Sequence, residues 1–230
     1  IVKQNAIRIQ LSPKDPVAKT IDHSVIHLDM DHKRYFLERV VRENPDKKIL
    51  VFVRTKVRAE RVVAAMARVE IESTSIHGDK DQEERSQIIK QFRDGEIMLL
   101  IATDITARGI DIPDIEIVVN YDLPDIPENY VHRVGRTGRA KNKGWAYSFC
   151  AEHEVETLRT IQTFLHKEIT EIKIDKANYQ DTLKIERERK LDYQSLVDEI
   201  EEFDKKKKKK KGKWELSNHL MSDYDFYDSA

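Results

Sequence analysis

Two short stretches of the chain, KILVFV (48–53) and IMLLIAT (97–103), carry apolar residues at consecutive positions. A strand with this pattern is buried on both faces, which is typical of a parallel sheet covered by helices. The full set of strand-like runs is 23–29, 48–53, 73–78, 97–103, 115–121, 145–150 and 169–174, and helical spacing of apolar residues occurs over 31–43, 56–69, 81–93, 127–134 and 152–166. The sequence therefore predicts an α/β domain with a doubly wound, mainly parallel sheet flanked by helices.

Glycine, proline and charge divide the 230 residues into parts. Six of the seven glycines lie between residues 78 and 144, and the last proline is Pro127. Beyond about residue 175 the apolar spacing gives way to runs of charge, so we expect a partly helical or disordered C-terminal extension. The expected parts are an interdomain linker over 1–20, the α/β domain over 21–175, a charged helical extension over 176–204, and a lysine run with an acidic, aromatic tail over 205–230.

Composition excludes several classes of protein. No apolar run approaches the roughly 18 residues that a membrane span needs, and the first residues lack a signal-peptide pattern. The lone cysteine, Cys150, allows no internal disulfide, which fits a reducing compartment. We therefore expect a cytoplasmic protein without a membrane partner. A formal net charge of −1 also argues against a simple basic nucleic-acid binder.

Arginine, threonine and glycine follow several of the predicted strands. Ligands of doubly wound sheets bind at the carboxyl ends of the strands, and these residue types hold phosphate oxygens and sugar hydroxyls. The candidates are Arg54, Thr55 and Lys56; His77, Gly78 and Asp79, with Gln82 and Arg85; Thr103, Asp104, Arg108, Gly109 and Asp111; and, at the end of the helix 127–134, His132, Arg133, Gly135, Arg136, Gly138 and Arg139.

Each candidate alone also has an ordinary structural explanation. A threonine after a strand more often caps a helix, a lone histidine sits in a turn, and arginines near a helix end usually pair with its dipole or with solvent. Four such clusters follow one another along the chain, however. Because of this conjunction, we interpret them together as one phosphate-binding edge.

The segments HGDKDQEER, ATDITARGIDIP and YVHRVGRTGR resemble, in order and spacing, the later motifs of a DEAD-box RNA helicase. The resemblance covers roughly residues 21–170, and the motifs look most like those of the bacterial RhlE-like branch. It implies a RecA-like fold and ATP-dependent, local separation of short RNA duplexes. The chain departs from the full family pattern, because it contains neither a GxxxxGK[ST] phosphate loop nor a DEAD tetrapeptide.

This departure, together with a start at Ile1, indicates the C-terminal RecA-like domain and extension of a longer protein. The fragment alone is then expected to hydrolyse no ATP. The resemblance implies that Arg136 and Arg139 are arginine fingers toward the ATP γ-phosphate and that Asp111 contacts the ATP ribose. It assigns His132 and Arg133 to coupling between the domains. ATP would come with Mg²⁺, whose ligands are expected on the N-terminal RecA-like domain.

For RNA, the resemblance implies contacts by Thr55, Gly78, Arg85, Thr103 and Gly109, with Gln82 supporting Arg85 and Arg108 holding the loop of Asp111. These groups suit phosphates and 2′-hydroxyls rather than base edges. We therefore predict binding of single-stranded RNA, or of a short duplex, without sequence specificity. The expected partners are RNA and the N-terminal RecA-like domain of the same protein.

The lysine run is a second possible RNA contact. A nonspecific anchor would gain affinity by releasing counterions from phosphates, but runs of like charge are ordinarily solvated linkers, and acidic segments flank this one. The run consists of Lys205, Lys206, Lys207, Lys208, Lys209, Lys210 and Lys211.

A different functional class is a non-catalytic scaffold that binds RNA or protein through a helicase-like domain. Arg136, Arg139 and Asp111 favour the enzyme, since a pure scaffold has no use for groups that meet a nucleotide. The coding sequence upstream of Ile1 would separate the two: a phosphate loop and a DEAD motif there indicate the helicase.

Overall fold

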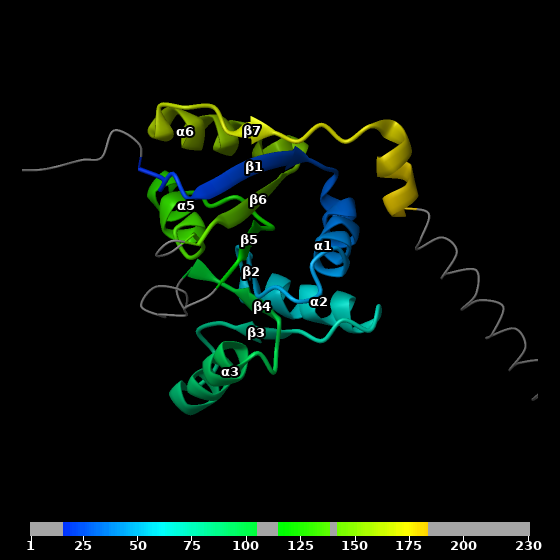
Figure 1. Cartoon of the computed structure of the whole chain (residues 1–230), viewed down its shortest axis with the longest axis vertical. Helices are drawn as coiled ribbons and strands as arrows, with labels where there is room; N and C mark the ends of the chain where they lie inside the picture. The colour runs from blue at the N-terminus through cyan, green and yellow to red at the C-terminus, as the bar shows by residue number, and fades with distance from the viewer. Residues whose placement is uncertain (1–15, 105–114, 139–141, 184–230) are drawn as a thin grey trace, which may run out of the picture. The chain divides into compact units, whose positions relative to one another are not determined.

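A computed structural model describes residues 16–104, 115–138 and 142–183 (Figure 1). The chain divides into two units, residues 1–176 and 177–230. The described residues of the first unit form an α/β domain. In the second unit, the described residues 177–183 are helical.

The first unit is built on a seven-stranded sheet in the order β3-β4-β2-β5-β6-β1-β7. Every pairing between its strands is parallel, which confirms the predicted α/β architecture. The strands are β1 (Ile21–His27), β2 (Ile49–Phe52), β3 (Thr74–Ile76), β4 (Leu99–Ala102), β5 (Ile117–Asn120), β6 (Gly144–Cys150) and β7 (Thr170–Glu171).

The predicted strands are found near their expected positions, but β3, β4 and β5 are each three residues shorter than expected and β7 differs most. The sequence predicts a strand over 169–174, but β7 consists of Thr170 and Glu171 only. It is an edge strand that pairs with Ser24 and Val25, and both of its residues are exposed. An edge strand has a neighbour on one side only, so it forms about half the ladder hydrogen bonds of a central strand. The apolar pattern over 169–174 therefore continues beyond the two residues that pair.

The helices follow the predicted segments closely, and residue-specific caps set their ends. Thr55 and Asp81 accept hydrogen bonds from backbone N–H groups at the starts of α2 and α3, and Gly95 ends α3 with a left-handed φ of 79°. No helix in the described residues is both long and apolar enough to cross a membrane. The labelled helices in the described residues are η1 (Met30–His32), α1 (Lys33–Arg42), α2 (Lys56–Ala67), α3 (Gln82–Asp94), α5 (Pro127–Val134), η2 (Glu152–Glu154) and α6 (Val155–Leu165), and residues 176–183 are helical as well.

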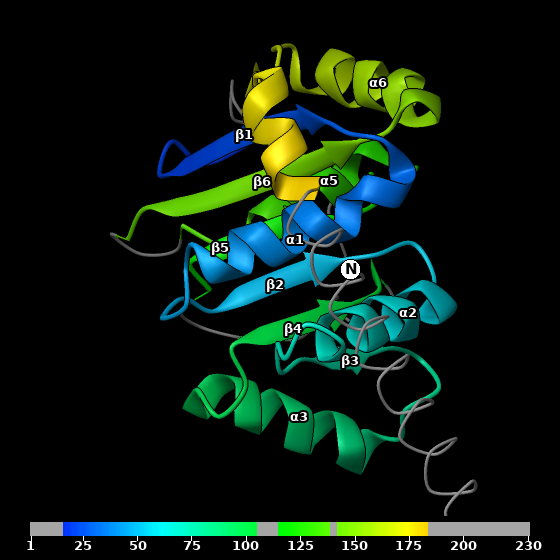
Figure 2. The same cartoon turned by 90° about the vertical axis from the view of Figure 1, so that its right-hand side faces the viewer.

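Helices cover both faces of the sheet. α1 and α2 lie on one face, while α5 and α6 lie on the other (Figures 1 and 2). This follows from right-handed crossovers, because the chain moves along the sheet in one direction from β1 to β3 and then turns back. The central strands β2, β4 and β5 are therefore buried along their whole length.

Cys150, at the end of β6, gives a direct test of this fold. Its side chain is 1% exposed, and burial, together with the nearby Glu154 carboxylate, raises the pKa of the thiol to about 11. We expect iodoacetamide at pH 8 to alkylate the native chain on the order of a hundredfold more slowly than the unfolded chain, because the thiolate is the reactive form. Mass spectrometry reads this directly, since the chain has a single cysteine. Equal rates with and without denaturant would contradict the fold around β6.

Candidate functional site

Three of the sequence-predicted residues lie together at the carboxyl edge of the sheet. Thr55 follows β2, Gly78 follows β3 and Thr103 follows β4. These strands are neighbours in the order β3-β4-β2, so their carboxyl ends are adjacent. The structure thus brings residues from separate motifs to one edge, where Thr55 and Gly78 are exposed and Thr103 is buried, with 7% exposure.

Thr55 has a structural role of its own at this edge. Its hydroxyl oxygen accepts a hydrogen bond from the Arg58 N–H (3.2 Å) and so caps α2. The ordinary explanation of a threonine after a strand is therefore correct for its side-chain contact. Thr55 is also exposed, with the exposed side chains of Arg54 and Lys56 on either side of it. The cap fixes the start of α2 and leaves this face of the loop open.

A carboxylate on α2 holds the residues that lead into the loop of Gly78. Glu60 Oε1 accepts a hydrogen bond from the Ser75 hydroxyl (2.5 Å) and contacts His77 Nε2 (2.8 Å). The hydrogen bond from Ser75, and then the one from His77, lowers the pKa of Glu60. A Cβ built on Gly78 meets nothing within 4 Å, so Gly78 itself faces open space.

Arg85 lies in the first turn of α3. Asp81 caps this helix by accepting a hydrogen bond from the Glu84 N–H (2.8 Å). Gln82 Oε1 accepts a hydrogen bond from Arg85 Nη1 (3.4 Å), a contact that suits a supporting residue. Arg85 Nε is buried and has no hydrogen-bond partner among the described residues. The role of both side chains in RNA binding stays a prediction.

Arg133 connects the ends of several strands from a buried position on α5. Two of its nitrogens donate to the two carboxylate oxygens of Asp104, at 2.6 and 2.8 Å. Its third nitrogen, Nη1, donates to the Asp122 carbonyl oxygen (2.7 Å) and to Asn120 Oδ1 (3.3 Å). The guanidinium also lies 5.0 Å from the centre of the Phe52 ring. Arg133 thereby joins the carboxyl ends of β2, β4 and β5.

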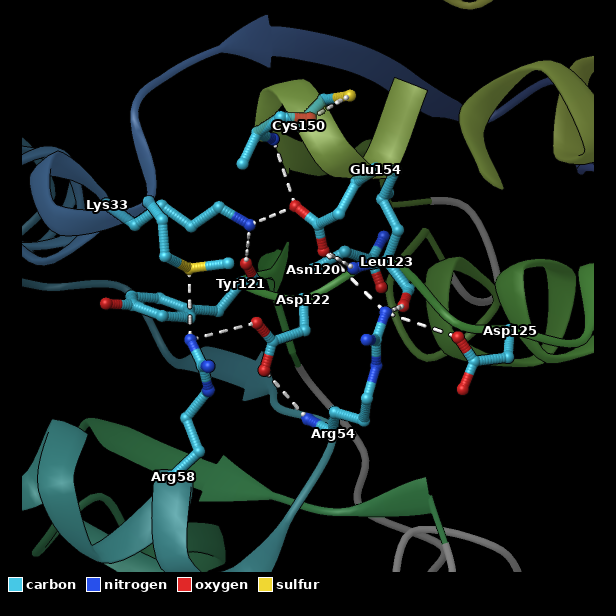
Figure 3. Close-up of polar contacts among 12 residues, drawn as sticks. Lys33, Arg54, Arg58, Asn120, Tyr121, Asp122, Leu123, Asp125, Cys150 and Glu154 are labelled. Carbon is cyan, nitrogen blue, oxygen red and sulfur yellow. Dashed lines mark hydrogen bonds and ion pairs between the residues drawn. The ribbon is translucent and has the colours of Figure 1, made fainter. Parts of the chain in front are cut away.

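Asp122 is a second residue that joins loops at this edge. The sequence analysis did not select it. Its carboxylate accepts a hydrogen bond from the Arg54 N–H (2.9 Å) and forms an ion pair with Arg58 (3.4 Å; Figure 3). The Arg54 guanidinium reaches back to the Leu123 carbonyl oxygen (3.3 Å) and to Asp125 (3.2 Å). The loops that follow β2 and β5 are therefore held against each other.

A buried ion pair supports the loop after β5 from the other side. Lys33 contacts Glu154 and donates to the Tyr121 carbonyl oxygen (2.8 Å), while Glu154 accepts from the N–H groups of Leu123 (3.1 Å) and Ala151 (3.0 Å; Figure 3). Both charged side chains are at most 1% exposed. Desolvation lowers the pKa of Lys33, and the Glu154 charge opposes that shift. This pair ties α1 and η2 to the two residues that flank Asp122.

The arginine loop, residues 135–138, continues from α5. His132, in the last turn of α5, is exposed, and its carbonyl oxygen accepts a hydrogen bond from Arg136 Nε (3.3 Å). Arg136 is half-buried. Thr137 is 1% exposed and donates through its hydroxyl to the Glu116 carbonyl oxygen (2.8 Å). The Thr137 contact fixes the loop against the start of β5.

Other sequence-predicted residues lie outside the described part of the chain. They are Arg108, Gly109, Asp111, Arg139, Lys205, Lys206, Lys207, Lys208, Lys209, Lys210 and Lys211. Within the described ranges, no group of three or more His, Cys, Asp or Glu side chains is arranged to hold a metal ion.

Sequence reasoning missed Lys33, Asp122 and Glu154. Asp122 had a usable signal, because it follows a predicted strand as Arg54 and Thr103 do. Lys33 and Glu154 had none: they stand in charged segments, DHKRY and AEHEVE, that read as solvated surface. Their burial depends on contacts between residues far apart in the chain.

Comparison with known proteins gives a consistent family signal. Residues 32–141 match the family model described as the helicase conserved C-terminal domain. The ATP-dependent RNA helicase DbpA of Bacillus subtilis is 39% identical over 170 residues, a match that covers 74% of this chain and 35% of that protein. The chain spans about a third of the length of the curated relatives it matches.

Solved structures agree with this signal. The E. coli DEAD-box protein SrmB superposes with a TM-score of 0.64 at 32% identity, covering 69% of this chain and 93% of that one. S. cerevisiae Dbp5, in a structure bound to RNA and ADP BeF3, gives a TM-score of 0.69 at 31% identity and covers 79% of this chain and 49% of that one.

The buried ion pair predicts a large effect on stability. Lys33→Met leaves the Glu154 carboxylate buried without its countercharge, which typically costs about 3–5 kcal/mol in the free energy of unfolding. The double variant K33M/E154Q removes both charges and should recover part of this loss. Urea denaturation measures all three proteins. The matched control is Lys56→Met, which removes the exposed ion pair with Asp79 and should leave the stability nearly unchanged. Similar losses for K33M and K56M would contradict a stabilising role of the Lys33 countercharge.

Proposed function

The chain belongs to the helicase conserved C-terminal domain family as it occurs in DEAD-box RNA helicases, and from this premise we propose that it is the second motor domain of an ATP-dependent RNA helicase. In this proposal an N-terminal RecA-like domain of the same protein holds ATP. The present domain completes the ATP site and supplies half of the RNA site. The finer membership of the RhlE-like branch and the cytoplasmic location stay predictions.

The observation that carries the proposal is the shared edge of Thr55, Gly78 and Thr103. The exposed Thr55 and the open backbone at Gly78 can contact an RNA sugar-phosphate backbone, and the buried Thr103 lies between them at the end of β4. Arg54 and Lys56 stand on either side of Thr55 in the chain, and their side chains are exposed by 42% and 56%. Two positive charges therefore lie beside this edge. The described edge offers phosphate contacts, so binding would be independent of base sequence.

The arginine loop would serve the ATP site. A guanidinium is always charged and binds phosphate oxygens bidentately, so Arg136 and Arg139 would neutralise negative charge that grows at the γ-phosphate during its transfer. The half-buried position of Arg136 at the end of α5 suits a group that meets a ligand held by another domain. Asp111 would contact the ribose, and Mg²⁺ would be bound by the N-terminal domain.

The mechanism follows from these two surfaces. ATP on the N-terminal domain would draw this domain in through Arg136 and Arg139, and docking would align the RNA contacts of both domains. His132 and Arg133 would couple the two sites. The aligned surfaces would bend one strand out of a short duplex. Hydrolysis would remove the γ-phosphate that the arginines hold, and the domains would then separate and release the strand.

Arg136→Ala tests the proposed ATP contact in the full-length protein. An arginine finger typically contributes roughly 10³ to 10⁵ in the rate of phosphoryl transfer. We therefore expect RNA-stimulated ATP hydrolysis to fall by about that factor, while nucleotide binding, measured with a fluorescent ATP analogue, is largely retained. Arg159→Ala is the control, because Arg159 is an exposed arginine paired with Glu156 on α6. Undiminished hydrolysis in R136A would refute the finger, whereas a parent protein without RNA-stimulated hydrolysis would favour the scaffold.

Arg85→Ala tests the proposed RNA contact. Loss of one phosphate contact should weaken binding of a single-stranded RNA oligonucleotide by about tenfold, with the same factor for different sequences. It should also reduce the slope of log affinity against log salt concentration by about one. Fluorescence anisotropy titrations at several salt concentrations measure both quantities. An unchanged slope would show that Arg85 does not contact a phosphate.

A further inference from the structure

The contacts of Thr20 point to a positioning role that the family motifs do not cover. We propose that Thr20 is a positioning residue for the arginine loop. Through Thr20, the segment that leads into the domain is joined to the loop that carries the proposed ATP contacts. The proposal rests on the proposed function, because it concerns the loop that carries Arg136 and continues into Arg139. Thr20 lies directly before β1, at the end of the expected interdomain linker.

Two hydrogen bonds join Thr20 to a part of the chain more than a hundred residues away. The Thr20 hydroxyl donates to the Gly138 carbonyl oxygen at 2.7 Å. The Thr20 carbonyl oxygen accepts a hydrogen bond from the Gly144 N–H at 3.0 Å, at the start of β6. One residue therefore contacts both the arginine loop and the first residue of the following strand.

The backbone segments around Gly138 and Gly144 pack closely against each other. Gly138 has a left-handed φ of 66°, and a Cβ there would lie 2.6 Å from Ile21 Cγ1 and 3.3 Å from the Thr20 carbonyl oxygen. A Cβ on Gly144 would lie 2.3 Å from the Gly138 backbone nitrogen and 2.2 Å from Thr137 Oγ1. Glycines at both positions let three backbone segments come together.

The hydrogen bond to Gly138 holds the peptide unit that leads into Arg139. The Gly138 carbonyl belongs to the planar peptide unit that joins Gly138 to Arg139, so fixing its oxygen fixes the plane from which the chain continues. Thr137 anchors the same loop from the other side through its hydroxyl bond to Glu116. Thr20 and Thr137 thus hold the loop between β1 and β5.

This arrangement has a consequence for coupling. If Thr20 is displaced when the linker changes direction, the Gly138 carbonyl loses this donor and the arginine loop loses a side-chain anchor. Small errors in the placement of a group that stabilises a transition state reduce the rate more than they reduce binding. The inference is that the hydroxyl of Thr20 contributes to turnover, without touching ATP or RNA.

A matched set of variants in the full-length protein tests this. Thr20→Val keeps the shape of the side chain and removes the donor, whereas Thr20→Ser keeps the donor. We expect T20V to lower the kcat of RNA-stimulated ATP hydrolysis by about tenfold, with the KM for ATP and the affinity for single-stranded RNA within about twofold of the parent protein. T20S should retain nearly the parent kcat. If T20V does not fold, T20A against T20S makes the same comparison.

The possible results separate this inference from the proposed function. An unchanged kcat in T20V, an equal loss in T20S, or a loss of RNA affinity that parallels the loss of kcat would each overturn the positioning role. R136A is measured beside them. If R136A hydrolyses ATP normally, the proposed function itself fails; if R136A is inactive and T20V is normal, only the role of Thr20 fails.

Discussion

Parallel pairing of the strands is the constraint on which the rest of the site depends. Because the described strands all run the same way, each leaves the sheet at the same edge, and the loops that follow must share that edge. Their polar backbone groups still need partners. The N–H groups of Tyr121 and Asp122 both donate to the Phe52 carbonyl oxygen, which joins the loops after β2 and β5 through the backbone alone. The charged side chains then join the remaining loops to these two.

Those charged side chains cost free energy to bury, and each is matched by partners. Arg133 is 2% exposed, and the contacts of its nitrogens include a carboxylate, a carbonyl oxygen and an amide oxygen. Glu154 is 1% exposed and accepts hydrogen bonds from two loops as well as from Lys33. Buried ion pairs often contribute little net stability compared with apolar residues of the same size. We infer that this network specifies one arrangement of the loops, which the proposed RNA and ATP contacts would both require.

The sequence predicts the architecture better than it predicts this network. Apolar runs and helical spacing locate the strands and helices, because burial on the two faces of a sheet leaves a local pattern. The rule that ligands meet residues after strands brings Thr55, Gly78 and Thr103 to one edge, and applied to β5 it would also have found Asp122. It could not find Glu154, since nothing local distinguishes a buried glutamate in a charged segment from a solvated one. Its partners, Lys33 and Leu123, are 121 and 31 residues away.

The position of α5 explains why such a network matters for a motor domain. Arg133 lies in the last turn of α5, and Arg136 lies in the loop that begins where α5 ends. Any rotation or shift of α5 would disturb the contacts of Arg133 with Asp104, which follows Thr103 of the proposed RNA edge, and with Asp122 in the loop after β5. The end of α5, where the arginine loop begins, is therefore linked to the loops after β4 and β5 through one helix. If both proposed surfaces take part in one cycle, docking of this domain on another would act on both through this helix, beside any displacement of Thr20.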